Sequence, residues 1–267
     1  MIRIRRNKNG YYFLSVFICS ISVTCVQFVF GSITNCQLSI VNSQFPADTL
    51  NYVLGKFDPA NDTRFIRIEN KYGSDKEMYL RKEVYEAFIK MYEAAKAEGV
   101  YLKIISATRN FSKQKKIWED KWTGKHLVNG KNLSQTVKDP VERAKMILRY
   151  SSMPCISRHH WGTDVDLNTL ENAHFNTVAG KQLYEWLQHH AAQFGFCQPY
   201  SSKTAHNRTG YEEEKWHWSY IPLAAPLLKY YLNNVKPQDI KGFEGSETAT
   251  DIDVITKYVG GVNKDCY

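Results

Sequence analysis

No internal repeat, low-complexity block or linker rich in proline, glycine or serine divides the 267-residue sequence. These absences exclude a repeat protein and favour one domain over several joined by flexible segments. No glycine-rich phosphate loop follows any expected strand, which disfavours a nucleotide-binding doubly wound fold. The chain does contain ample material for a core, because 43% of its residues are hydrophobic, with 13 Phe, 17 Tyr and 6 Trp. We therefore expect a globular protein.

The first 31 residues differ in composition from the rest. Four basic residues at positions 3 to 8 precede an apolar run over 11–30, and Gly31 and Ser32 offer a cleavage point, which is typical of an export signal. The run is also near the length needed to cross a bilayer, so an uncleaved anchor is one alternative and a lipid-modified Cys36 is another. We expect an exported protein of the periplasm or cell envelope, attached to a membrane only through this segment.

The net charge and the number of cysteines both change when residues 1–31 are left out. Because residues 1–31 carry four basic and no acidic side chains, the formal net charge falls from +8 to +4 without them. So small a charge gives no reason to expect nucleic acid as a partner. The remaining cysteines allow three disulfide pairings in an exported protein, and their spacing is not that of a zinc knuckle. They are Cys36, Cys155, Cys197 and Cys266.

Apolar periodicity predicts helices interspersed with short strands. Helices are expected at about 75–98, 112–122, 139–150, 177–194 and 222–234, with Asp139 as an N-cap and Pro140 in the first helical position. Strands are expected at 101–107, 163–167, 196–200 and 216–220. This order predicts an α+β domain with a small, mainly antiparallel sheet flanked by helices. The expected organisation is a leader (1–31), a linker (32–51), one folded domain (52–235) and a tail (236–267) that packs on the domain or is flexible.

Two short segments, at 157–166 and 214–217, carry the residue types of a catalytic metal site. His159 and His217 offer imidazoles, and Asp164 and Asp166 offer carboxylates. A catalytic zinc ion takes three such ligands and leaves one position open for water. Gly162 would allow a turn between the first histidine and the carboxylates. Since 164 and 166 have the same parity on a strand, spacing leaves the choice between them open.

The acidic run before His217 offers a general base. Glu212, Glu213 and Glu214 all stand close to the histidine in sequence, and spacing alone does not choose among them. The tryptophans on either side of His217 would keep the site rigid and partly dry. His160 is expected to point away from the metal, as a hydrogen-bonded group on the surface or behind the ligands.

The pattern Ser-x-His-x-x-Gly-x-Asp-x-Asp at 157–166, followed by Glu-x-Trp-His at 214–217, resembles the signature of the D-alanyl-D-alanine carboxypeptidase family of zinc peptidases. That family includes the dipeptidases and carboxypeptidases associated with vancomycin resistance. The resemblance implies that His159, Asp166 and His217 hold Zn²⁺ and that Glu214 is the general base. It selects Asp166 over Asp164, where the family usually has a small apolar residue. The extra carboxylate would bind a ligand histidine or alter the charge at the metal.

An upstream segment, 106–114, extends the resemblance. It is similar to the strand-end segment whose arginine contacts the substrate and the developing oxyanion, which implies a catalytic and substrate-binding role for Arg109. Ser157 and Gln114 match family positions near the substrate, although Ser157 could instead cap the turn. The resemblance covers about residues 52–234 and implies the zinc peptidase fold that Hedgehog signalling domains share.

The activity implied by the resemblance is release of C-terminal D-alanine from peptidoglycan stem peptides by a monomeric zinc carboxypeptidase. Alternatives in the family are an L,D-carboxypeptidase, a D,D-dipeptidase and a peptidoglycan endopeptidase. A binding module that holds zinc without catalysis is the alternative from another class. Glu214 and Arg109 argue against it, because a binding module needs neither a base nor an oxyanion donor.

Overall fold

The computed structural model describes residues 2–6, 12–16, 46–74 and 77–267. Contacts divide the chain into two units, residues 1–43 and 44–267. In the first unit, β1 (Ile2–Arg6) pairs antiparallel with β2 (Tyr12–Val16). The rest of the expected export signal, Cys36 and most of the expected linker lie outside the described residues. Among the described residues, no helix has the length and apolar character needed to cross a membrane.

The second unit is built on a four-stranded antiparallel sheet in the order β5-β6-β8-β7. Its strands are β5 (Ile104–Ser106), β6 (Asp164–Leu167), β8 (His217–Tyr220) and β7 (Phe196–Cys197). Every residue of the inner strand β6 is buried, so both faces of the sheet are covered. The predicted α+β class, with a small antiparallel sheet flanked by helices, is confirmed.

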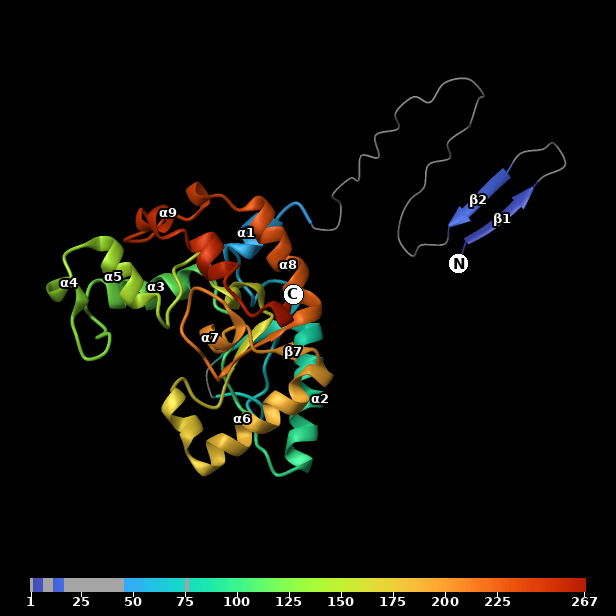
Figure 1. Cartoon of the computed structure of the whole chain (residues 1–267), viewed down its shortest axis with the longest axis horizontal. Coiled ribbons are helices and arrows are strands. Elements are labelled where there is room, and N and C mark those ends of the chain that lie inside the picture. The colour runs from blue at the N-terminus through green and yellow to red at the C-terminus, as the bar shows by residue number, and fades with distance from the viewer. Residues whose placement is uncertain (1, 7–11, 17–45, 75–76) are drawn as a thin grey trace, which may run out of the picture. The chain divides into compact units, whose positions relative to one another are not determined.

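One face of the sheet packs on α2 (Lys82–Ala97) and α6 (Val178–His190), which are both seen in the lower part of Figure 1. The core on this face joins side chains of β6, β8 and both helices, among them Val165, Trp218, Phe88 and Leu187. Because side chains alternate along a strand, Asp164 and Asp166 point to the opposite face. That face carries the candidate site.

The second core covers the opposite side and is formed mainly by helices. It includes side chains of α3 (Phe111–Trp122), α5 (Pro140–Ile147) and α8 (Ile221–Asn234). Asp139 is the N-cap of α5 and Pro140 opens it, as expected, because the Asp139 carboxylate accepts the amide of Glu142. The tail also enters this core through Ile240 and Val259, and α9 (Thr248–Ile252) packs against α5 (Figure 1).

The remaining elements are short. The α-helices are α1 (Thr49–Val53), α4 (Leu133–Thr136) and α7 (Lys203–His206). The 3-10 helices are η1 (Arg158–Trp161), η2 (Asn172–Asn176), η3 (Ala191–Phe194), η4 (Pro237–Asp239) and η6 (Lys264–Cys266), and η5 (Ile255–Val259) is a π-helix. Since α1 begins at Thr49, ordered structure starts before residue 52, where the folded domain was expected to begin.

Two differences from the predicted elements have local causes. The helix expected from residue 75 begins at Lys82, because β4 (Tyr79–Arg81) comes first and pairs with β3 (Phe65–Arg67). The strand expected over 196–200 ends at Cys197, and Pro199 beyond it has no amide to donate to a ladder. Cys197 forms a disulfide with Cys266, which attaches the tail to the sheet, whereas Cys155 is free and buried.

Candidate metal centre

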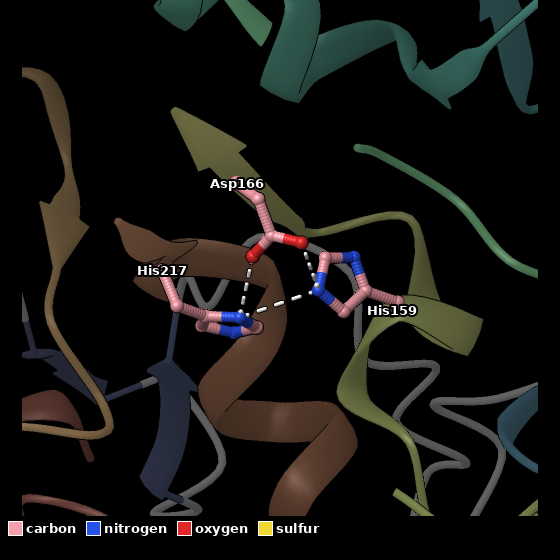
Figure 2. Close-up of side chains that lie close together, drawn as sticks. All are labelled: His159, Asp166 and His217. Atoms are coloured by element: carbon pink, nitrogen blue, oxygen red, sulfur yellow. Dashed lines mark hydrogen bonds and ion pairs between the residues drawn. The ribbon is translucent and has the colours of Figure 1, made fainter. Parts of the chain in front are cut away.

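His159, Asp166 and His217 come together on the face of the sheet opposite α2 and α6. One ligand atom from each lies within 4.8 Å of the other two, and all three side chains are buried. The Nδ1 atom of His217 is 3.0 Å from Asp166 Oδ1 and 3.2 Å from His159 Nε2. His159 Nε2 is 3.3 Å from Asp166 Oδ2, so the three groups face a common point (Figure 2). Two imidazole nitrogens and one carboxylate are a donor set that catalytic zinc uses.

The local backbone explains this convergence. His159 lies on η1, which ends at Gly162 with φ of 70°, in the left-handed region. A Cβ atom at this glycine would be only 2.3 Å from Cε1 of Phe65. The tight turn leads directly into β6, where Asp166 is paired with His217 of β8 across the antiparallel ladder. The three residues therefore meet because one turn and one strand pair bring them together.

Hydrogen bonds fix the orientation of both histidines. His159 donates from Nδ1 to the carbonyl oxygen of Ala107 at 2.8 Å, which leaves Nε2 facing the centre. His217 donates from Nε2 to Asp164 at 2.8 Å, which leaves Nδ1 facing the centre. Burial lowers the pKa of His159, with a smaller effect from Arg109, and so favours the neutral ring that a metal requires. Burial opposes a charged His217, yet hydrogen bonds to Asp164 and Asp166 raise its pKa to about 9 in the metal-free protein.

Glu214 is the member of the acidic run that reaches the centre. Its Oε2 atom is 3.6 Å from His217 Nδ1, and the side chain is buried. Burial raises the pKa of Glu214 to about 8, with a further contribution from Asp166. Glu212 instead pairs with Lys203 at 3.2 Å, and the half-buried Glu213 makes no ion pair with the centre.

Arg109 follows β5 and is held against η1. Its amide donates to the carbonyl oxygen of His159 at 3.1 Å, and its own carbonyl oxygen accepts from His160 Nδ1 at 2.5 Å. The buried Nε atom of Arg109 has no hydrogen-bond partner among the described residues. The positive charge of Arg109 lowers the pKa of Glu214, although burial outweighs that effect. His160 is fully buried, so it does not lie on the surface. Its Nε2 atom accepts the amide of Cys155, so both ring nitrogens have partners.

Gln114 and Ser157 are both buried near these groups. Gln114 donates from Nε2 to the carbonyl oxygen of Ser152 at 2.7 Å, and its Oε1 has no hydrogen-bond partner among the described residues. Ser157 occupies the N-cap position of η1, but its side chain makes no capping hydrogen bond. Its carbonyl oxygen accepts the amide of His160 instead, so no side-chain hydrogen bond supports the alternative role of Ser157 as a cap.

Two residues near the site, Tyr200 and Lys121, escaped the sequence analysis. The ring of Tyr200 packs on His217, with centroids 4.6 Å apart. Trp216 and Trp218, the two tryptophans expected to shield the site, both belong instead to the core on the other face of the sheet. Lys121 donates to the hydroxyl of Ser151; burial lowers its pKa, as does the charge of Arg109. The helical spacing of Gln114, Trp118 and Lys121 on α3 is the signal that would have indicated the lysine.

Sequence comparisons add independent information. The family model described as D-alanyl-D-alanine carboxypeptidase matches residues 77–223. A D-alanyl-D-alanine carboxypeptidase of Enterococcus faecalis is 28% identical over 141 residues, 53% of this chain and 48% of that protein. A putative carboxypeptidase of Bacillus subtilis, YodJ, is 29% identical over 194 residues, 69% of this chain and 59% of that protein. The chain thus spans about half the length of these curated relatives.

A solved structure of VanYB in complex with D-Alanine-D-Alanine is 24% identical and covers 66% of this chain and 91% of its own, with a TM-score of 0.47. Because this TM-score is below 0.5, the family assignment rests on the sequence match. The matched region covers more than half of the chain and contains the three clustered candidate ligands together with Glu214 and Arg109. The chain belongs to the D-alanyl-D-alanine carboxypeptidase family.

Proposed function

We propose that this protein is a zinc-dependent carboxypeptidase that releases the C-terminal D-alanine of peptidoglycan stem peptides. The observation that carries the proposal is the buried cluster of His159, Asp166 and His217 with Glu214 beside it. Family membership supports the reaction class, and the Enterococcus faecalis relative is named for this activity. Zinc held by the three ligands would lower the pKa of a water molecule to about 7 and polarise the scissile carbonyl.

Glu214 is the general base in this mechanism. Its carboxylate accepts a proton from the attacking water and passes it to the amine that leaves. Burial favours proton uptake, since it raises the pKa of this group to about 8 in the metal-free protein. A cation at the three ligands favours the ionised form, which is the form that can accept the proton. The two effects together place the group close to the point where it can both take and release a proton.

Arg109 stabilises negative charge on the substrate. Its guanidinium is a fixed fork of donors that keeps its charge, and its buried Nε lacks a protein acceptor among the described residues. A carboxylate or a developing oxyanion of the substrate supplies that acceptor. Backbone hydrogen bonds to His159 and from His160 hold the start of this side chain in place. The proposed role is therefore electrostatic and does not involve proton transfer.

The proposed site of action is outside the cytoplasm. The disulfide between Cys197 and Cys266 supports this location, because such bonds persist mainly in oxidising compartments. The basic and apolar composition of residues 1–31 supports it as well.

Digestion of defined muropeptides tests the proposed function. Purified protein would be incubated with pentapeptide, tetrapeptide and cross-linked substrates and with free D-alanyl-D-alanine, and the products would be identified by mass spectrometry. We expect loss of one alanine from the pentapeptide and no reaction after removal of the metal by a chelator. Cleavage of only the tetrapeptide, of the cross-link or of free D-alanyl-D-alanine would replace the proposed bond by another in the same family. Zinc-loaded protein that cleaves none of them would contradict catalysis.

A further inference from the structure

Asp164 lies behind the metal centre and is fully buried. It accepts four hydrogen bonds, all from side chains. His217 Nε2 is 2.8 Å and Arg158 Nε is 3.0 Å from Oδ2, while the hydroxyls of Ser219 and Thr163 are 2.8 and 2.6 Å from Oδ1. The four donors lie on β8, on η1 and on the residue that precedes β6. A carboxylate with so many donors has one well-defined orientation.

Arg158 balances the charge of this carboxylate. The arginine is 1% exposed, donates from Nη2 to Ser219 at 2.6 Å, and lies over the ring of Trp161 at 4.8 Å. A buried carboxylate without such a partner would carry a large desolvation penalty. Because Arg158 and Asp164 neutralise each other, the pair adds no net charge next to the ligands. The alternative that Asp164 alters the charge at the metal is therefore disfavoured.

We propose that Asp164, held by Arg158, is a positioning residue that fixes the tautomer and ring orientation of His217. The imidazole must carry its proton on Nε2 for Nδ1 to present a lone pair toward His159 and Asp166. A carboxylate acceptor on Nε2–H secures that tautomer and increases the basicity of the other nitrogen. Asp164 thereby strengthens zinc binding without touching zinc or substrate. This inference rests on the proposed metal site but not on the proposed substrate.

The test compares three variants by zinc affinity and by the tautomer of His217. Asp164→Ala introduces a small apolar residue and removes the acceptor, and Asp164→Asn keeps an oxygen that can accept from Nε2–H. Arg158→Met combined with Asp164→Ala removes both charges, so that no uncompensated charge stays buried if the single variant fails to fold. Thr163→Val is the control, because it removes a hydrogen bond to Asp164 without changing the acceptor of His217.

Chelator competition would give the zinc affinity. Nitrogen-15 NMR of metal-free protein, recorded above the His217 pKa of about 9 so that the ring is neutral, would give the tautomer. We expect Asp164→Ala and the double variant to bind zinc about 10 to 100-fold more weakly than wild type. Both should lose the single Nε2–H tautomer, whereas Asp164→Asn should keep it and lose less affinity. The Thr163→Val control should stay close to wild type in both measurements.

Wild-type affinity and tautomer in the double variant would overturn the inference, and so would a loss in Thr163→Val as large as in Asp164→Ala. Failure of the wild-type protein to bind zinc would instead contradict the proposed function. In that case the tautomer measurement on metal-free protein still decides the role of Asp164.

Discussion

Replacement of Glu214 by Gln is expected to lower turnover by several orders of magnitude and leave zinc binding intact. Glutamine has nearly the same shape, and the carboxylate stands 3.6 Å from His217 without donating or accepting a bond that orients a ligand. The backbone of Glu214 is held by the carbonyl oxygen of Tyr200 at 2.9 Å and by Gln198 Nε2 at 3.1 Å. Neither bond uses the Glu214 side chain, so the segment should keep its position.

The expected size of the effect follows from the role of the group. General acid–base catalysis typically contributes about 10² to 10⁴-fold, which corresponds to roughly 3 to 5 kcal/mol of transition-state stabilisation. Because one carboxylate serves both proton transfers, we expect kcat to fall near the upper end of this range. The KM value should change little, since the ligands and Arg109 remain.

The same substitution lowers activity but is expected to raise the stability of the metal-free protein. In the metal-free protein the pKa of Glu214 is about 8, above the ordinary value of 4.5, so the folded state binds more protons than the unfolded state between these values. Stability of the metal-free wild type should therefore fall as the pH rises from 4.5 to 8. The Glu214→Gln protein lacks this group and should be more stable than wild type at pH 7, by on the order of 3 kcal/mol.

The assay combines zinc content, muropeptide turnover and urea unfolding of metal-free protein. Glu213→Gln is the matched control, since it changes the neighbouring charge without reaching the centre. Full activity in zinc-loaded Glu214→Gln protein would refute the base assignment. Equal losses in Glu213→Gln and Glu214→Gln would refute the argument from position.

Three further predictions concern the scaffold of the site. Gly162→Ala should destabilise the protein by about 2 to 4 kcal/mol in urea unfolding, because φ is 70° and the new Cβ would lie 2.3 Å from Phe65; unchanged stability would contradict the turn. Cys266→Ser should lower stability by up to about 4 kcal/mol, since the bond to Cys197 closes a loop over a sequence separation of 69; a denaturation midpoint equal to that of the oxidised wild type would refute this. Burial lowers the pKa of His160 to about 3, so stability should fall as the pH drops below 6.5, and this slope should shrink in His160→Asn; equal slopes would contradict a buried neutral ring.

Long periodic elements of the fold could be predicted from the sequence. The helix expected over 112–122 is α3 (Phe111–Trp122), and the strand expected over 163–167 is β6, because apolar spacing and cap residues are local signals. The pair β3 and β4 was missed, since each strand has only three residues and its stability comes from the partner strand. The packing of the tail was left open because it depends on a core assembled from distant helices.

In the candidate site, too, some features could be predicted from the sequence and others depend on contacts between distant residues. The spacing predicted that His159, His217 and a carboxylate lie together. It could not decide between Asp164 and Asp166, because both point to the same face. The structure distinguishes them by their partners, since Asp164 is engaged by Arg158 behind the ring of His217. No pattern along the chain indicates that pairing, which arises where η1 turns back on β6.

Anomalous scattering at the zinc edge from a crystal of the zinc-loaded protein tests the central claim most directly. The structure predicts a single strong peak bound by His159 Nε2, the carboxylate of Asp166 and His217 Nδ1. A peak elsewhere, or zinc bound through Asp164 or through Nε2 of His217, would contradict the account.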